Sequence, residues 1–395
     1  SFSRRKKLSD LTIMALLLVL AVLFGLAESE VNFAHSILFD QYDIFQPNQT
    51  RFVNDLCKAG CSIYASIPPG STKALEAAKN VIVTDLESEM TLFDIAALID
   101  PVTTQKKSFD LPEKQRTPQI NAGNVEPGAG PLLVYVFSNT GKSNVPFEVY
   151  EARTMKRAVS PAGIVTILSP EPFTVGTEPT QLGNTVYAHA AGMENAIDSG
   201  PDNCAKVFEL NEPSSFSGFV LNVQLPILSF YFNMDTPVDF YTRMDYSTVT
   251  GFDQFLTSPG FTGCYGMQVY QSSLYQYSIG HTVSGEKLTY LRVDATLNND
   301  ETTKVKITDI TNNVDYNLVG DNAHNNAQQS IFIDQSKFLF INWTRGTYTR
   351  SAFLLRFTTS DVPYPTTTVI PTERTTSSAV RDSIVLLLML TAVLR

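Results

Sequence analysis

The side chains that most often carry out chemistry are few and scattered in this sequence. Its four histidines, His35, His189, His281 and His324, stand far apart, and none forms an H-E-x-x-H pattern or another metal-ligand spacing. The sequence also has no G-x-S-x-G elbow, no P-loop and no G-x-G-x-x-G. We therefore predict that the protein is not an enzyme and has no catalytic residue, cofactor or metal.

One acidic motif allows another interpretation. Asp198, Ser199 and Gly200 match the D-[ST]-G of aspartic proteases, in which two carboxylates share one proton. Only one copy is present, and Pro201 and Asp202 follow it. Because Asp, Ser, Gly and Pro all favour turns, we interpret the motif as a turn. An enzyme whose catalytic residues follow no motif stays the alternative, and an acidic cluster in a cleft would reveal it.

The four cysteines predict disulfides. Cys57, Cys61, Cys204 and Cys264 are an even number in a chain that we expect to be exported, so two bridges are expected among three possible pairings. Pairing Cys57 with Cys61 and Cys204 with Cys264 keeps each bridge local. The C-x-x-x-C spacing is also compatible with a redox or metal pair, but no second Cys or His pair stands nearby to complete a tetrahedral site.

The beginning of the chain predicts export. A basic cluster at residues 4–7 precedes an apolar stretch from Leu11 to Leu26, and the small residues Gly25 and Ala27 follow the pattern of a signal-peptidase site. We predict a secretory signal over residues 1–27 that is cleaved after Ala27. A retained signal anchor is the alternative, although this apolar stretch is short for a membrane span.

The end of the chain predicts a lipid anchor. The apolar run from Ile384 to Leu394 would reach only about 16 Å as a helix, roughly half of a bilayer core. Small residues at Ser377 and Ser378, a short polar spacer and this run resemble a glycosylphosphatidylinositol attachment signal, with residues 379–395 removed. A marginal tail anchor, or an end without consequence, is the alternative. Residues 361–378, rich in Thr and Pro, predict an extended stalk.

Charge and sequons fit the same location, the outer face of the plasma membrane. Removing residues 1–27, with four basic side chains and one acidic one, changes the formal net charge from −10 to −13. Nucleic acid and anionic lipid head groups are therefore not expected partners. Two N-x-[ST] sequons predict glycosylation at Asn48 and Asn342.

The pattern of apolar residues predicts a mainly all-β protein of two or three β-sandwich domains with few short helices. Helical periodicity is confined to "STKALEAAKN" and "EMTLFDIAALID". Segments rich in Val, Ile, Tyr and Phe recur between turn-forming clusters. They are "CSIYAS", "NVIVTD", "LLVYVF", "PFEVYEA", "GIVTIL", "GFVLNVQL", "SFYFNM", "VDFYTRM", "LTYLRVDA", "KVKITD", "SKFLFINW" and "AFLLRF".

The predicted strand at residues 338–343 has two different faces because side chains alternate along a strand. A glycan on Asn342 requires its own face to be open. The opposite face, with Leu339, Ile341 and Trp343, is then expected to be buried.

A cluster of aromatic residues permits two interpretations. It can form a platform on which the C–H faces of a sugar stack, or it can fill a sandwich core, which is the more common use of such alternation. The cluster consists of Phe230, Tyr231, Phe232, Phe240, Tyr241 and Tyr246.

Two segments share the pattern V-x-[VI]-T-D-[LI], at residues 81–86 and 305–310, which suggests a duplication. In each half a further pair of aromatic residues ten positions apart ends in an alternating strand. We predict an N-terminal β-sandwich domain over residues 28–155 and a second domain over 251–360. The stretch 156–250 between them is either a small domain or the front of the second one.

The last third of the chain resembles a CUB-like domain. The similarity rests on "LTSPGFTGC" (Leu256 to Cys264), "KLTYLRVDATL", "TKVKITD", "SKFLFINWTRG" and "SAFLLRF". It implies a jelly-roll β-sandwich like those of the divergent secreted CUB-like proteins of nematodes, and with it a role in the innate immune or stress response. Many CUB domains bind calcium, but Thr302, Thr303, Thr344 and Arg345 stand where their ligands are expected, so calcium binding does not carry over. A rearranged site is the alternative, since Asp300 and Glu301 lie near but out of register.

These observations predict an extracellular, membrane-anchored binding or recognition protein. Its expected partners are an unidentified protein or glycan ligand and, through the lipid anchor, the membrane. The alternatives are a structural surface-coat glycoprotein, which should self-associate, and a lectin-like carbohydrate-binding module.

Overall fold

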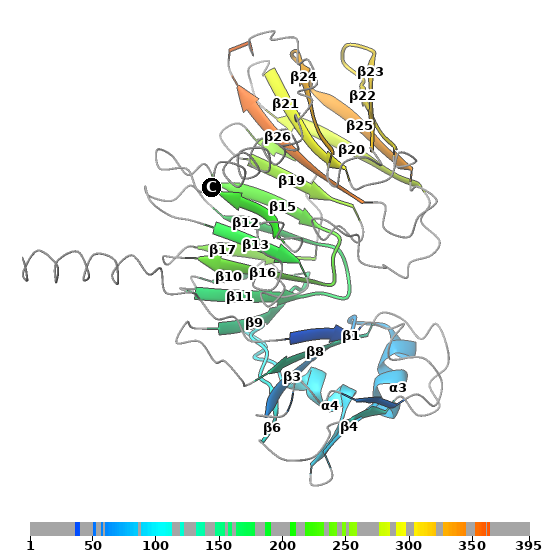
Figure 1. Ribbon diagram of the computed structural model, residues 1–395, viewed down its shortest axis with the longest axis vertical. Helices are drawn as coiled ribbons and strands as arrows, with labels where there is room; N and C mark the ends of the chain where they lie inside the picture. The colour runs from blue at the N-terminus through cyan, green and yellow to red at the C-terminus, as the bar shows by residue number, and fades with distance from the viewer. Residues whose placement is uncertain are drawn as a thin grey trace, which may run out of the picture.

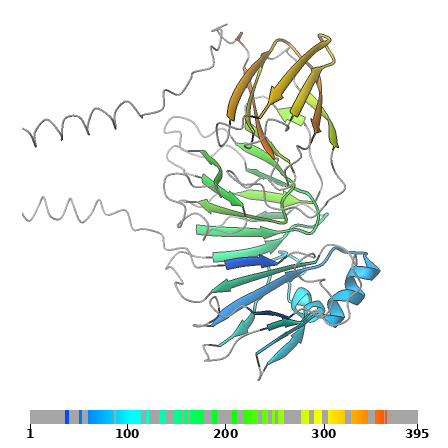
Figure 2. The same ribbon diagram turned by 45° about the vertical axis from the view of Figure 1, so that its right-hand side comes forward.

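The protein consists of three packed units in a row, seen in a computed structural model (Figures 1 and 2). The predicted signal, the anchor signal and almost all of the stalk lie outside the residues described. No helix within the described ranges is long and apolar enough to cross a membrane. The structure describes residues 36–39, 50–52, 57, 60–85, 88–112, 119–121, 132–138, 147–154, 157–159, 163–177, 186–190, 206–210, 218–232, 237–242, 247–249, 253–258, 276–284, 290–297, 304–320, 327–344, 352–360 and 362–363.

The N-terminal unit contains two four-stranded sheets that share one hydrophobic core. Sheet 1 has the order β1 (Ser36–Phe39), β8 (Leu133–Ser138), β3 (Cys61–Ser66), β6 (Phe109–Leu111). Sheet 2 has the order β2 (Thr50–Phe52), β7 (Gln119–Asn121), β4 (Ile82–Thr84), β5 (Glu89–Thr91).

Two short helices complete this unit, α3 (Thr72–Asn80) and α4 (Leu92–Ala97). Each begins at a side-chain cap: Ser71 Oγ accepts from Ala74 N at 3.3 Å, and Thr91 Oγ1 accepts from Asp94 N at 3.1 Å. Both helices place apolar side chains in the core of sheets 1 and 2. They lie in the two segments for which helical periodicity was predicted.

The remaining strands form three further sheets. Sheet 3 has the order β14 (Lys206–Leu210), β13 (Val186–Ala190), β16 (Ile227–Phe232), β11 (Gly163–Leu168), β9 (Phe147–Glu151). Sheet 4 has the order β10 (Arg157–Val159), β17 (Val238–Tyr241), β12 (Phe173–Thr177), β15 (Phe219–Val223), β19 (Asp253–Thr257), β26 (Phe353–Ser360), β21 (Tyr290–Leu297), β24 (Ala327–Ile333). Sheet 5 has the order β18 (Ser247–Val249), β20 (Gln276–Ser284), β25 (Phe338–Thr344), β22 (Lys304–Asp309), β23 (Val314–Val319).

Sheet 4 belongs to two sandwiches at once. Sheet 3 packs on its first half around a core that includes Phe230 and Phe240. Sheet 5 packs on its second half around a separate core that includes Leu339 and Trp343. The parallel pairing of β15 with β19 makes the two halves one continuous sheet.

The two sandwiches lie on opposite faces of sheet 4. Phe255 of β19 pairs with Leu221 of β15, and both side chains enter the core under sheet 3. The next residue, Leu256, pairs with Leu355 of β26, and both enter the core under sheet 5. Successive side chains of a strand point to opposite faces. The core under sheet 3 reaches as far as Phe255 of β19 and Leu354 of β26. Beyond them, the face of sheet 4 that points away from sheet 5 carries partly exposed side chains on β21 and β24.

A buried ion pair joins the N-terminal unit to sheet 3. The loop at residues 98–107 runs beside β9, where Lys106 N donates to Val149 O at 2.8 Å and Glu151 N donates to Thr104 O at 3.0 Å. Lys106 Nζ lies 3.2 Å from Glu151 Oε2, and both side chains are buried. Burial lowers the pKa of Lys106, and the Glu151 carboxylate opposes that shift. The contact fixes how the first unit meets the second.

The predicted fold class is confirmed. All twelve segments predicted as strands contain a strand, and the described residues are mainly strands in five sheets. The predicted domain boundaries stay predictions. The structure adds that β15 and β19, which lie on either side of residue 250, are neighbours in one sheet.

Candidate functional site

The histidines do not form a catalytic or metal site in the described part of the chain. His281 is buried between the two sheets of the C-terminal sandwich and stacks on Phe357, with ring centroids 4.4 Å apart. Burial lowers its pKa to about 3, so it is neutral at physiological pH. His189 lies far along the chain on β13, and His35 and His324 lie outside the described residues.

Metal ligands are not gathered either. Within the described ranges, no group of three His, Cys, Asp or Glu side chains is placed to hold a metal ion. The motif at Asp198, Ser199 and Gly200 lies outside those ranges, as do Thr302 and Thr303.

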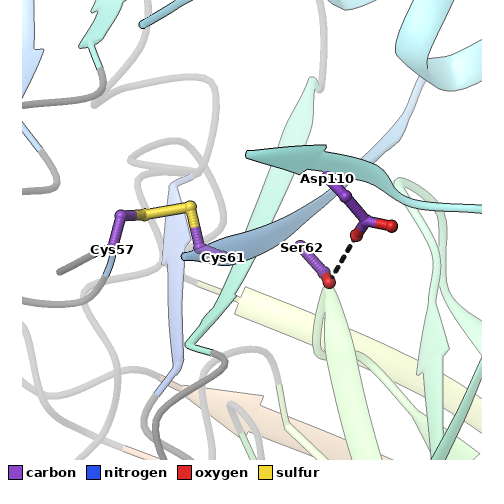
Figure 3. Close-up of a disulfide and its surroundings, with 4 residues drawn as sticks. All are labelled: Cys57, Cys61, Ser62 and Asp110. Atoms are coloured by element: carbon purple, nitrogen blue, oxygen red, sulfur yellow. Dashed lines mark hydrogen bonds between the residues drawn. A yellow bond between two sulfur atoms is a disulfide. The ribbon is translucent and has the colours of Figure 1, made fainter. Parts of the chain in front are cut away.

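The first predicted disulfide is confirmed. Cys57 and Cys61 are joined, with their Cα atoms 4.8 Å apart, and the bridge lies at the start of β3 (Figure 3). Gly60 makes the short loop possible because its φ of 86° favours glycine. Cys204 and Cys264 lie outside the described residues, so their pairing stays a prediction.

The aromatic cluster fills a core where the structure describes it. Phe230 and Phe240 are fully buried in the sandwich of sheets 3 and 4. Tyr231 and Tyr241 are half-buried. The side chains of Phe232 and Tyr246 lie outside the described part. Phe230 and Phe240 therefore do not belong to a sugar-stacking platform.

The predicted alternation around Asn342 is confirmed. Leu339, Ile341 and Trp343 are buried in the core under sheet 5, whereas Phe338 and Phe340 are each 37% exposed on its outer face. Glycosylation of Asn342 itself stays a prediction. Asn48, Ser377 and Ser378 lie outside the described residues.

A polar surface on the second half of sheet 4 is the best candidate for a binding site. It is the face opposite the core of the C-terminal sandwich, and we call it the arginine face. Cross-strand register places its residues side by side, since Asp294 of β21 pairs with Arg356 of β26, and Arg292 pairs with Phe332 of β24. The arginine face consists of Arg292, Asp294, Ser330, Phe332, Arg356 and Thr358, and at its inner edge it meets the buried residues Asp253 and Phe255.

The outer part of the arginine face is an ordered, exposed group. Arg292 Nε contacts Asp294 Oδ1 at 2.8 Å, and the guanidinium carbon lies 6.0 Å from the centroid of the Phe332 ring. Ser330 Oγ donates to the same Asp294 oxygen at 2.5 Å. The Arg292 side chain is 45% exposed. The guanidinium group has five N–H donors, of which the Nε–H is the one directed at Asp294.

The inner part has the same arrangement but is more buried. Arg356 Nη2 contacts Asp253 Oδ2 at 2.8 Å, and its guanidinium carbon lies 5.7 Å from the centroid of the Phe255 ring. Thr358 Oγ1 donates to Asp253 Oδ1 at 3.2 Å. The Asp253 side chain is 6% exposed and that of Arg356 35%. Each arginine thus has one aspartate and one aromatic ring, which hold the planar guanidinium in place.

The sequence contained a signal for this site that motif searching does not detect. Arg292 and Asp294 occupy alternate positions of "YLRVDATL", and Arg356 lies within the apolar "FLLRF". Period-two alternation places these three on the face away from most of the apolar residues of their strands, although Leu354 shares the face of Arg356. Which strands stand beside each other was not readable from those segments, so the grouping with Asp253 could not be found from sequence.

Comparisons with known proteins give no family for this chain. No protein-family model matches the sequence, and no characterised protein matches it. Among solved structures, the chain is similar to the CUB1-EGF-CUB2 domains of rat MASP-1, at 9% identity over 53% of this chain and 99% of that chain, with a TM-score of 0.17. It is also similar to the tandem CBM51 modules of the family 98 glycoside hydrolase Sp3GH98 from Streptococcus pneumoniae, at 8% identity over 51% of this chain and 83% of that chain, with a TM-score of 0.19. Values this low do not assign the chain to either group.

Proposed function

We propose that this protein is an extracellular recognition protein of the CUB-like type, held on the outer face of the plasma membrane by a lipid anchor. The observation that carries the proposal is the arginine face, where the exposed guanidinium group of Arg292 and the partly buried one of Arg356 are each held by an aspartate. The Cys57–Cys61 bridge is consistent with an oxidising compartment. The signal over residues 1–27 and the attachment signal after Ser377 and Ser378 support the location.

The chemistry of the arginine face suits a ligand rich in hydroxyl groups. Arg292 and Arg356 are matched by Asp294 and Asp253, so the face carries both signs of charge in equal number. Guanidinium groups donate and carboxylates accept hydrogen bonds, and a sugar hydroxyl can do both. The half-buried Phe332 ring beside Arg292 offers an apolar surface to a C–H face. The acidic chain repels polyanions, which favours a neutral glycan.

A glycan of a microbial surface is the ligand class we propose, and recognition of it would serve an innate immune response. The test is to release the ectodomain with phospholipase C from cells that express the full chain and to apply it to glycan and microbial-surface arrays. Binding to a defined set of neutral glycans is expected. Failure to bind any array, or self-association as the only interaction, would refute the recognition function and favour a structural coat.

A pair of variants assigns the binding to the arginine face. Arg292→Ala removes the most exposed guanidinium, and we expect its affinity to fall about tenfold or more because charged hydrogen bonds are lost. Lys304→Ala is the matched control, since Lys304 is an exposed cation on sheet 5 of the same sandwich. Equal losses in both variants would place the ligand elsewhere.

The anchor has its own readout. If phospholipase C leaves the protein on the cells while detergent extracts it, the lipid anchor is wrong, and the binding measurements can still be made on detergent-extracted protein. Replacing both Ser377 and Ser378 with a bulky residue should reduce surface display, since attachment requires small residues at this site.

A further inference from the structure

Sheet 5 carries most of the exposed large apolar side chains in the described part of the chain, and all of these except Val314 belong to its outer face. Five of the seven lie on this sheet or directly beside its strands, so the grouping is local rather than scattered. We call the central part, Phe338 and Phe340 of β25 with their strand neighbours Gly280, Thr282 and Thr308, the aromatic face. The five are Ile310, Val314, Val319, Phe338 and Phe340.

Gly280 leaves room for the Phe338 ring to lie close to the backbone of β20. A Cβ atom at Gly280 would lie 2.9 Å from Cζ of Phe338, so the Phe338 ring extends across the glycine on the neighbouring strand. Phe340 stands directly opposite Gly280 in the register, between β20 and β22. The Phe338 ring therefore fills the space above Gly280, and Phe338 and Phe340 are each 37% exposed.

The predicted sequon is built into the same surface. Asn342 follows Phe340 by two residues on β25, so the two side chains share a face and their Cα atoms lie about 7 Å apart. Thr344, which completes the sequon, is again two residues on. Ser278 Oγ of β20 donates a hydrogen bond to Asn342 Oδ1 at 2.7 Å. This bond uses the amide oxygen of Asn342, whereas an N-linked glycan is joined to the amide nitrogen, Nδ2.

We propose that Asn342 carries an N-linked glycan whose first N-acetylglucosamine lies with its C–H face on the Phe340 ring and extends toward Phe338. This rests on the export of the chain that the proposed function includes. In the modification, Asn342 Nδ2 forms a bond to the anomeric carbon of a lipid-diphosphate-linked oligosaccharide. The carbon–oxygen bond to the diphosphate breaks, the lipid diphosphate leaves, and Nδ2 loses one proton.

The occupant is a glycan because the geometry supplies its attachment point. The sugar is joined two residues from an exposed ring on the same face, so it reaches the ring without a second binding event. Covering Phe340 also removes apolar surface from water, which stabilises the folded state. A partner protein would instead have to dock over the glycan that this sequon directs to the same place.

The experiment measures the link between the glycan and Phe340. The full chain with Asn48→Gln is expressed in glycosylating animal cells, so that Asn342 is the only sequon with a sugar. Peptide mass spectrometry is expected to find Asn342 occupied. Removing the glycan enzymatically should lower the Tm of this protein by roughly 2–4 °C, the shift that a modest stabilisation produces in a domain of this size. In the same protein with Phe340→Ala, removal should change Tm by less than about 1 °C.

A second variant and a second measurement test the proposal even if Phe340→Ala does not fold. Phe340→Leu keeps an apolar side chain without a ring, and it replaces Phe340→Ala in the Tm measurement in that case. Proton NMR of the intact glycoprotein should show the N-acetylglucosamine signals shifted upfield by the ring current of Phe340, and the Leu variant should lose this shift. An unoccupied Asn342, or an equal Tm loss with and without the ring, would overturn the proposal.

Failure of export can be told apart from failure of the glycan contact. A second version of the full chain carries an established secretory leader in front of Ser1. If only this version is secreted and its glycan shows the dependence on Phe340, the native signal is wrong and the contact stands. If both versions are secreted and neither shows the dependence, the contact is wrong and the location stands.

Discussion

The C-terminal sandwich has two outer faces that follow the same alternation and differ in chemistry. On sheet 4, the arginine face pairs each guanidinium with a carboxylate and an aromatic ring, so its polar groups are already ordered. On sheet 5, the aromatic face exposes Phe338 and Phe340, and a single glycine opens the space beside them. Alternation along each strand thus decides which residues point outward, while the residues of the neighbouring strands decide which interactions those residues can make.

The largest expected change in stability comes from His281, which lies between the two faces. His281 of β20 lies in the core that separates them, and burial holds its pKa at about 3. Between pH 6.5 and 3 the unfolded chain binds a proton at His281 and the folded chain does not. The free energy of unfolding should therefore fall by about 1.4 kcal/mol for each pH unit as the pH decreases through this window. Urea unfolding at pH 7, 6, 5 and 4.5 measures it.

His281→Phe is the control for this pH dependence, because it keeps a ring against Phe357 and does not titrate. The variant should lose this part of the slope and keep the part that the carboxylates contribute. If both proteins show the same slope between pH 4.5 and 6.5, the sandwich core does not exclude the imidazolium as described.

The inner end of the arginine face should matter more for stability than any residue on the aromatic face. Asp253→Asn removes the charge opposite Arg356 while the amide oxygen can still accept from Thr358. We expect a loss of about 2–3 kcal/mol in the free energy of unfolding, because a mostly buried charge pair loses one partner. Thermal and urea unfolding measure it. In the Arg356→Met background the same substitution should cost much less, and full additivity would show that the pair is not coupled.

Gly280→Ala tests the close packing on the aromatic face. Its Cβ would meet the end of the Phe338 ring at 2.9 Å, so the ring has to turn, and we expect a loss of about 1 kcal/mol. In the Phe338→Ala background the obstacle is absent, and alanine should then be neutral or stabilising because it is less flexible than glycine in the unfolded chain. A loss of equal size in both backgrounds would mean that the ring does not lie over Gly280.

The outer end of the arginine face should show the smallest change in stability. Asp294→Asn breaks the contact with Arg292, but both side chains are partly exposed, and we expect a loss below about 1 kcal/mol. Ligand binding should nevertheless weaken, because Arg292 is no longer held over Phe332. Array binding and urea unfolding of the same protein separate the two effects. If Asp294→Asn lost much stability but bound the ligand normally, this expectation for the outer end of the arginine face would be wrong.

Local patterns explain why so much of the fold was predictable. The alternation that buries Leu339, Ile341 and Trp343 lies within seven consecutive residues, and so does the capping of α3 by Ser71. The disulfide joins Cys57 and Cys61, which are four positions apart in the sequence. None of these features depends on which strand comes next in space.

The repeated V-x-[VI]-T-D-[LI] pattern shows how much of the fold a short sequence segment can predict. Both copies end a strand with a buried Asp that accepts from a following turn: Asp85 from Ser88 N at 2.8 Å, and Asp309 from Thr311 N at 3.0 Å. The surrounding pairings differ. In the second copy β22 lies beside β25, which carries Trp343, ten residues before Phe353. In the first copy the matching aromatic residue is Phe137, ten residues before Phe147, and its strand β8 belongs to another sheet than β4. The likeness therefore describes a strand and its turn. It does not extend to the order of strands around them.

The arginine face could not be predicted for the same reason. Asp253 and Arg356 are separated by more than a hundred residues along the chain and meet only because β19 pairs with β26. Alternation predicts that Arg292 and Arg356 point outward, but neither segment shows which strand pairs with it in the sheet. Strand order in a sheet is set by the packing of whole layers, which short patterns do not record.

Strand β19 also decides how the molecule responds when it is pulled or heated. Phe255 anchors it in one core and Leu256 in the other, so neither sandwich can open without removing a side chain from its neighbour. The two should melt together as one cooperative block. Force applied on the C-terminal side of β26 would pass across its hydrogen bonds into β19 and spread over both sandwiches instead of unfolding only the last one.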